Sequence, residues 1–231
     1  MKTFVHTLAI GLLFASTAAS AQEVSKVFGF SKPFPDSFEK GDCKSNMGLA
    51  PGIRVTMPMG DRFGIGLGLA HEWRSARTEQ ETENGTVPLS DVKGRAFLLQ
   101  ATGQYRIFTC ASKCQSSMGV MVGADVTLPY RTNALQYASD GSELTTDRDR
   151  DRMKAGLAFR AGLRYSVPLC EHMGFFMEPQ LIYKAVLDRT DEAAQFGRSE
   201  RTSDRLGMGM QGGIYMKLMC PGKCPVKASA Q

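Results

Sequence analysis

Hydrophobic and polar residues alternate with a period of two along most of the chain. In the segment 63–70 every odd position is large and apolar, and every even position is Gly or Ala. This alternation is typical of a β-strand that has one face in an apolar environment. The same pattern recurs in six further segments: 47–57, 97–107, 118–128, 157–165, 175–184 and 206–217. The chain is therefore predicted to be all-β, with seven strands visible in the pattern.

The connections between these segments alternate in length. Short ones fall at 58–61, 109–116 and 168–173, whereas long polar ones run over 75–93, 131–152 and 188–204. Short turns at one end and long loops at the other are typical of outer-membrane barrels.

An eighth strand is required ahead of the seven. The strand 47–57 runs into a short turn, so its first residue lies at the long-loop end and another strand must lead up to it. Only Glu23–Phe30 can supply this strand, with 31–46 as the first long loop. We therefore expect an eight-stranded antiparallel up-and-down transmembrane β-barrel that occupies residues 22–219.

The two faces of the predicted strands indicate the surrounding medium. In a soluble barrel, such as a lipocalin-like periplasmic carrier, the apolar rows would point inward and the other rows would meet water. Here the other rows consist mainly of Gly, Ala and Gln, which suit the narrow interior of an eight-stranded barrel better than a wet surface. The apolar rows are therefore predicted to face lipid, since a closed barrel leaves no unpaired backbone edge there.

Aromatic residues near the strand ends are predicted to form the two girdles of a membrane barrel. At the short-turn end they are Phe63, Tyr105, Phe108, Tyr165 and Phe175, and at the long-loop end they are Trp73, Phe97, Tyr130 and Tyr183.

Charged residues occur in the rows predicted to face inward: Arg54, Glu72, Arg106, Asp125, Arg160, Arg164, Glu178, Lys184 and Lys217. Buried charges need partners, and the hairpin at 168–173 places Glu178 opposite Arg164. We predict a salt-bridge network that plugs the lumen, with Asp125 and Arg160 near mid-height. Its members are Arg54, Asp125, Arg160, Arg164, Glu178 and Lys184. The alternative interpretation of this basic interior is an anion pathway.

The alternating segments, the alternating loop lengths and the polar interior resemble those of the small outer-membrane β-barrel superfamily, which includes the OmpA transmembrane domain and OmpX-like proteins. The resemblance covers residues 23–218 and implies a bacterial outer membrane, insertion by its assembly machinery, and contact with its lipids and lipopolysaccharide as a monomer. The chain departs from the family pattern at its end. The last strand finishes at Tyr215–Met219 without a terminal aromatic residue and continues into Cys220–Cys224.

The first residues carry the features of a signal peptide. Lys2 precedes the apolar run Leu8–Phe14, and Ala19–Ala21 has the small-x-small pattern of a cleavage site before Gln22. The run is shorter than the about 20 apolar residues of a spanning helix. We therefore expect residues 1–21 to direct export, and residues 220–231 to form a periplasmic tail.

Six cysteines in an exported chain favour disulfides, because the bacterial periplasm is oxidising. The simplest prediction pairs Cys110 with Cys114 and Cys220 with Cys224. In the competing arrangement Cys170 is linked to one of those two segments. Cys43 lies at the opposite end and is expected to be free or to pair with another molecule. A metal site and a redox role for the cysteines are the open alternatives, and no metal or cofactor is expected.

The formal net charge of +5 is scattered along the chain and lacks the basic and aromatic interleaving that binds single-stranded nucleic acid. Nucleic acid is therefore not an expected partner. The segment 145–152 alternates in sign and could bind lipopolysaccharide phosphates through its arginines, or it could be paired within itself.

Two histidines, His71 and His172, follow the predicted cleavage site. His71 lies on the lipid-facing row beside Glu72, but no Ser follows it at two residues, as a His-x-Ser deacylase would need. We therefore expect no catalytic residues. The predicted role is structural or interactive at the cell surface, and a lipid-modifying enzyme that uses His71 is the alternative.

Overall fold

The computed structural model of the protein describes residues 23–33, 43–82, 85–109, 116–137, 142–147, 154–188, 190–191 and 205–218. Nine strands occur in this part of the chain: β1 (Glu23–Pro33), β2 (Cys43–Met59), β3 (Phe63–Thr82), β4 (Gly85–Thr109), β5 (Ser117–Tyr137), β6 (Glu143–Asp147), β7 (Gly156–Pro168), β8 (Met173–Val186) and β9 (Leu206–Lys217).

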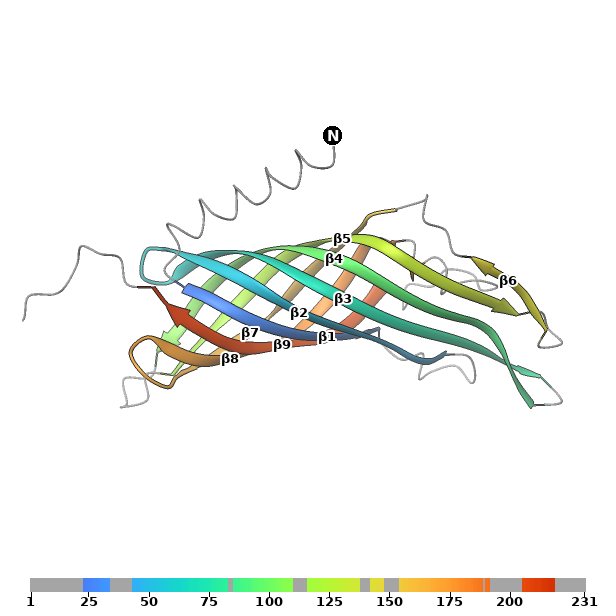
Figure 1. Ribbon diagram of the computed structural model, residues 1–231. Coiled ribbons are helices and arrows are strands. Elements are labelled where there is room, and N and C mark those ends of the chain that lie inside the picture. Colours follow the sequence, from blue (N-terminus) through green and yellow to red (C-terminus); the bar gives the residue numbers. More distant parts are fainter. Residues whose placement is uncertain are drawn as a thin grey trace, which may run out of the picture.

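Eight of these strands form a closed antiparallel barrel (Figure 1). Consecutive strands of the ring pair with one another, and β5 pairs with β7 because β6 is not part of the ring. β1 closes the ring by pairing with both β2 and β9. The short strand β6 lies outside the ring and pairs with β5 alone among the described strands. The predicted eight-stranded up-and-down barrel is confirmed.

The alternation of polar and apolar residues is irregular in β1, and the register of this strand explains why. Val27 points inward and is buried with Phe176 and Tyr215, while Lys26 points outward and is exposed. Val27 is paired with Gly52 on β2 and Gly213 on β9, which leave room for an inward valine. The usual polar-in, apolar-out order is thus reversed at these two positions of β1.

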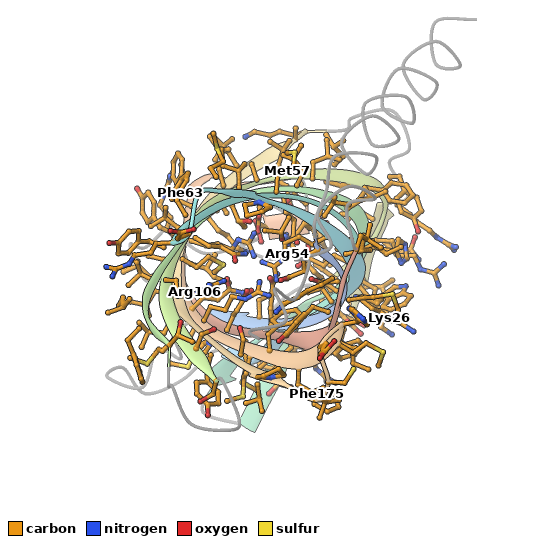
Figure 2. The ribbon with its side chains drawn as sticks, turned by 90° about the vertical axis from the view of Figure 1, so that its left-hand side faces the viewer. Lys26, Arg54, Met57, Phe63, Arg106 and Phe175 are labelled. Atoms are coloured by element: carbon orange, nitrogen blue, oxygen red, sulfur yellow. The ribbon has the colours of Figure 1, made fainter. Side chains whose placement is uncertain are left out.

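The apolar rows point away from the barrel axis. Viewed along the barrel, Phe63 and Phe175 project outward, while Arg54 projects into the lumen (Figure 2). Exposed large apolar side chains occur on every barrel strand, with Val122 and Leu181 each 60% exposed, whereas Arg54 and Glu178 are fully buried. A soluble carrier would need the opposite arrangement, so the observed orientation is that of a barrel that faces lipid.

Short turns gather at one end of the barrel, where β1 begins and β9 ends. Between β2 and β3, Gly60 has a φ of 85°, a left-handed conformation that glycine adopts without steric strain. Between β7 and β8, the backbone amide of Leu169 donates to the carbonyl of Met173 over 2.8 Å. We call this the short-turn end.

At the other end the strands continue beyond the ring, which differs from the predicted long polar loops at 75–93 and 131–152. β3 and β4 pair without interruption of strand structure from Phe63↔Tyr105 to Thr82↔Gly85, with one register shift near Thr78. β5 extends to Tyr137 and is joined there by β6. These polar segments still form strands because backbone ladder hydrogen bonds between them do not require an apolar face. Figure 1 shows both hairpins projecting past the barrel.

Several predictions fall on residues outside the described part of the chain. These are the signal peptide at 1–21, the tail at 220–231 and the cysteines Cys110, Cys114, Cys220 and Cys224, and nothing is described for the side chain of Cys43. Cys170 is exposed and has a free thiol in the turn between β7 and β8. Its predicted link to Cys110, Cys114, Cys220 or Cys224 stays a prediction, because those four cysteines lie outside the described residues. Within the described residues, no helix has the length and apolar character needed to cross a membrane.

The outward orientation predicts a depth-dependent cost for an added charge. Leu181 lies within β8 and is 60% exposed, and Leu169 lies in the short turn before β8 and is 57% exposed. We expect Leu181→Arg to lower the free energy of unfolding in lipid vesicles by about 2–4 kcal/mol, and Leu169→Arg by at most about 1 kcal/mol. Urea titration of the two variants measures this difference. Equal losses would contradict the assignment of β8 to the hydrocarbon region.

Candidate functional site

The lower lumen, nearer the short-turn end, contains two arginines and two glutamates. The carboxylate of Glu178 on β8 accepts from Arg54 Nη2 at 2.8 Å and from Arg164 Nη1 at 3.1 Å. Arg164 also donates to Glu23 at 2.6 Å. Glu178 and Arg54 have no exposed side-chain surface, so their charges are balanced within the lumen rather than by water. We call these four residues the lower cluster.

An aromatic ring supports the lower cluster. The guanidinium carbons of Arg164 and Arg54 lie 4.5 Å and 5.2 Å from the ring centre of Phe176, a cation–π geometry. On β3, Gly66 provides space for Arg54, because an added Cβ there would lie 3.2 Å from the Arg54 Cδ and 2.5 Å from the Thr102 hydroxyl. Small residues on the inward rows thus allow long charged side chains to fit.

Arg160 on β7 and Asp125 on β5 form the middle of the lumen. Arg160 Nη2 lies 2.8 Å from Asp125 Oδ1, in a close charge contact rather than an aligned hydrogen bond. Arg160 Nη1 donates to the side-chain oxygen of Gln180 at 3.3 Å. Both charged residues are buried.

The upper lumen, nearer the projecting hairpins, is occupied by side chains from the strands and from the segment after β8. Arg74 contacts Glu72 at 2.7 Å, Asp188 at 2.5 Å and Asp191 at 3.4 Å, and Lys184 lies 2.5 Å from Asp191. We call these five residues the upper cluster. Asp188 and Asp191 follow the last residue of β8, so this segment turns back into the barrel mouth.

A neighbouring contact fixes the same segment. Thr190 lies in hydrogen-bond range of Thr132 at 3.3 Å, and an added Cβ at Gly94 would come within 2.6 Å of its side chain. Thr190 is therefore seated against the inner wall of β4 and β5.

The pKa of Asp191 reflects this environment. Burial alone would raise the pKa of its carboxyl, but the charges of Lys184 and Arg74 and the hydrogen bond from Lys184 outweigh burial. The net effect is a pKa below the usual value, which keeps Asp191 ionised and attached to both cations.

Free space in the lumen is uneven. A cavity of ≈ 70 Å³ lies between the middle and the upper cluster, with Arg160, Asp125 and Lys184 in its lining. A hollow of ≈ 550 Å³ opens at the short-turn end, where Arg164 and Glu23 are among its lining residues. Arg106 and Lys217, predicted to belong to the interior, line this hollow and are exposed. They lie where their strands leave the narrow part of the barrel.

The structure brings all six residues of the predicted lumen network into the interior. Arg54, Arg164 and Glu178 meet in the lower cluster, Arg160 meets Asp125, and Lys184 joins the upper cluster. Sequence reasoning placed Glu72 in the lumen but missed Glu23, Arg74, Phe176, Asp188 and Asp191. Phe176 and Arg74 share the inward parity of Glu178 and Glu72, and this signal could have identified them.

His71 lies in an aromatic cluster on the outer face. Its Nε2 is 2.6 Å from the hydroxyl of Tyr130, and its ring is 4.7 Å from Trp73 in an edge-to-face contact. Phe97 stacks on Tyr130 in the same cluster at 5.1 Å. The hydrogen-bond partner of His71 is thus a girdle tyrosine, whereas a deacylase histidine would need a serine or a carboxylate.

Neither His172 nor a group of metal-ligating side chains forms a further candidate site in the described residues. His172 is exposed in the turn before β8, and its backbone carbonyl accepts from the amide of Lys217. No group of three or more His, Cys, Asp or Glu side chains with the spacing of a metal site occurs in the described ranges.

Comparison with known proteins gives similarity in three-dimensional structure only. No protein-family model and no curated protein matches the sequence. Neisserial surface protein A is 13% identical, with 85% of this chain and 95% of that chain covered and a TM-score of 0.41. Ail of Yersinia pestis is 15% identical over 85% and 98%, with a TM-score of 0.38. OprG of Pseudomonas aeruginosa is 13% identical over 87% and 95%, with a TM-score of 0.43.

The lower cluster makes a strong prediction about stability. Glu178→Gln keeps the side-chain shape but leaves the buried charges of Arg54 and Arg164 without their shared carboxylate. We expect the free energy of unfolding to fall by about 3–5 kcal/mol, as for a broken buried ion pair. Urea unfolding in detergent micelles measures it, with Glu171→Gln in an exposed turn as the control. If the two variants were equally stable, the lower cluster would have no structural role.

The lowered pKa of Asp191 predicts how its contribution depends on pH. A carboxyl with a depressed pKa in the folded state stabilises that state above its ordinary pKa of about 3.9, and this stabilisation is lost as the pH falls through the folded value. The difference in unfolding free energy between wild type and Asp191→Asn should be constant from about pH 5 to 8 and shrink below about pH 4. A difference that grew on acidification would contradict the ion pairs of Asp191.

Proposed function

We propose that the protein is a non-enzymatic outer-membrane barrel whose lumen is closed to solutes and whose projecting hairpins form an interaction surface. The observation that carries this proposal is the occupation of the lumen at three successive levels by mutually paired charges. In such a barrel, the outer wall and the exposed hairpins can contact other molecules, whereas the charged residues of the interior stabilise the fold.

The contacts across the lumen support the proposal that it is closed. The lower cluster joins β2, β7 and β8 to Glu23 of β1, and the middle contact joins β5 to β7. An ion on its way through would have to separate these pairs, and each separation exposes buried charge at a cost of several kcal/mol. The alternative of an anion pathway would require cations without carboxylate partners, whereas Arg54, Arg160 and Arg164 all have one.

The interaction surface is proposed from the extended sheet above the barrel. Register pairs extend β3, β4 and β5 past the ring, with Arg77 opposite Asp91 and Ser90 opposite Gln136. β6 pairs with β5 through Leu135↔Thr146, so one side of β6 is an edge within the described strands. Exposed sheet edges and polar hairpins are common sites for partner binding.

The environment is proposed from the same evidence. An outward apolar wall closed on itself fits a bacterial outer membrane, reached by export through residues 1–21 and inserted by the assembly machinery. We further propose that the protein is a monomer. It would contact outer-membrane lipids along its wall and lipopolysaccharide phosphates at its charged rim.

A closed lumen predicts an absence of conductance. Wild-type protein inserted into a planar lipid bilayer should give no stable current steps, because the ion-pair clusters bridge the lumen. Reproducible ohmic steps from the purified wild type would contradict the closed lumen. Insertion itself is checked by the protection of the barrel strands from protease.

The interaction surface is tested by shortening it. In cells that lack the native protein, full-length chain is compared with a variant lacking residues 79–88, which removes the tip of the β3–β4 hairpin and leaves the ring register intact. We expect the variant to reach the outer membrane at the level of the full-length chain but to lose adherence to glass and to cultured cells. Heat-modifiable gel mobility verifies folding of both forms. A variant that adheres as well as the full chain would contradict a role for this hairpin.

The non-enzymatic role is tested at His71. The lipid A and phospholipid composition of cells with His71→Ala should equal that of cells with wild type, because Tyr130 is the hydrogen-bond partner found for His71. A product seen with wild type and lost in His71→Ala, with folded protein at equal levels, would favour the lipid-modifying alternative.

A further inference from the structure

A groove on the outer wall of the barrel extends over the adjacent strands β1, β9, β8 and β7. It measures ≈ 580 Å³, and its lining is almost entirely apolar. The lining residues are Phe28, Phe30, Tyr165, Val167, Phe175, Phe176, Met177, Met210, Gly212 and Gly213. Except for Phe176 and Gly213, these residues belong to the outward rows, so the groove opens toward the hydrocarbon.

The groove exists because one outward position carries no side chain. Gly212 on β9 is paired with Phe28 on β1 and with Met177 on β8, and both neighbours project large side chains outward. A Cβ added at Gly212 would meet only the backbone oxygen of Phe176, at 3.4 Å. The wall therefore has a hollow that a larger residue could fill, and it is bounded by two bulky side chains.

A lysine lies beside this hollow on the same outer wall. Lys26 is two residues before Phe28 on β1 and points outward (Figure 2). It is paired with Ile53 on β2 and Ile214 on β9, both of which are exposed to the apolar medium. Among the described residues Lys26 makes no hydrogen bond or ion pair.

An ammonium that has no partner among the described residues and lies between two isoleucines in a membrane requires an anion or water. Lys26 is three residues from the start of β1 at the short-turn end, so its long side chain can extend toward the lipid headgroups there. The two features together, an apolar hollow and a cation below it, match the two parts of a phospholipid.

We infer that this wall is a binding site for one glycerophospholipid, with an acyl chain in the groove at Gly212 and the phosphate on Lys26. This inference rests on the barrel lying in a membrane and is independent of the role proposed for the hairpins. The short-turn end corresponds to the periplasmic side in barrels of this kind, so the lipid belongs to the periplasmic leaflet.

Charge also decides against a second copy of the chain as the occupant. On the described ring strands, Glu23, Glu72, Asp125 and Glu178 point inward. The other acidic residues, Glu79, Glu81 and Asp91, lie in the hairpin that projects beyond the opposite end of the barrel. A symmetric partner that packed its own β1 and β9 against these strands would therefore bring apolar rows or its own Lys26 against this Lys26, because neither strand has an outward carboxylate. A phosphate diester supplies the missing negative charge.

The inference is tested by native mass spectrometry of the full chain in mild detergent titrated with phosphatidylglycerol. We expect wild type to bind one lipid, with Lys26→Gln weakening binding by about fivefold and Lys26→Arg preserving it. Diacylglycerol, which lacks the phosphate, should bind wild type and Lys26→Gln equally. Equal affinity of wild type and Lys26→Gln for phosphatidylglycerol would overturn the assignment of Lys26.

The groove is tested with a matched pair of glycine variants. Gly103 on β4 also points outward, and a Cβ there would have its nearest neighbour at 3.7 Å on Val122. We expect Gly212→Leu to weaken lipid binding by about tenfold or more by filling the hollow, and Gly103→Leu to have no effect. If both variants weakened binding equally, or neither did, the groove would not be the acyl-chain site. Heat-modifiable mobility confirms folding, and Gly212→Ala serves if Gly212→Leu does not fold.

Discussion

Closure of the backbone ladder is the constraint on which the rest of this structure depends. Because β1 pairs with both β2 and β9, no ring strand has an unpaired edge in the part that faces lipid. Once the ring is closed, successive side chains of every strand point alternately to the outside of the barrel and into its lumen. A residue's position in the two-residue alternation then decides whether it meets hydrocarbon or the crowded lumen.

The inner medium explains the charge pattern. Eight strands leave a lumen only wide enough for side chains, so charges placed there lose water and must find each other. Glu178 satisfies two arginines at once, and Phe176 lies against both guanidinium groups. Glycines such as Gly66 are part of the same solution, because they provide the volume that Arg54 occupies. The arrangement that stabilises the barrel is therefore also the one that supports our proposal of a closed lumen.

The outer wall has exceptions to the pattern, and the proposed lipid site rests on two of them. Most outward positions are large and apolar, as a lipid-facing surface requires. Lys26 and Gly212 are not, and they lie on adjacent strands near the same end of the barrel. Beyond the ring, the strands enter water and the constraint on their side chains ends, yet their backbone pairing continues into the projecting hairpins.

The sequence by itself determined the fold class, the number of ring strands and the outward direction of the apolar rows, because alternation with a period of two is a local property that survives in the folded chain. It also indicated which charges share the lumen, since inward parity can be read for Arg54, Arg160, Arg164 and Glu178 one strand at a time. Parity does not state which charge meets which across the ring.

Only the tertiary structure decided that Glu178 bridges Arg54 and Arg164, that Asp188 and Asp191 turn back onto Arg74, and that 75–93 continues as strands. The physical reason is that these contacts depend on the shear of the closed ring and on segments after strand ends, neither of which leaves a periodic signal. The same holds for the groove at Gly212, which exists because three strands bring Phe28, Gly212 and Met177 into one row.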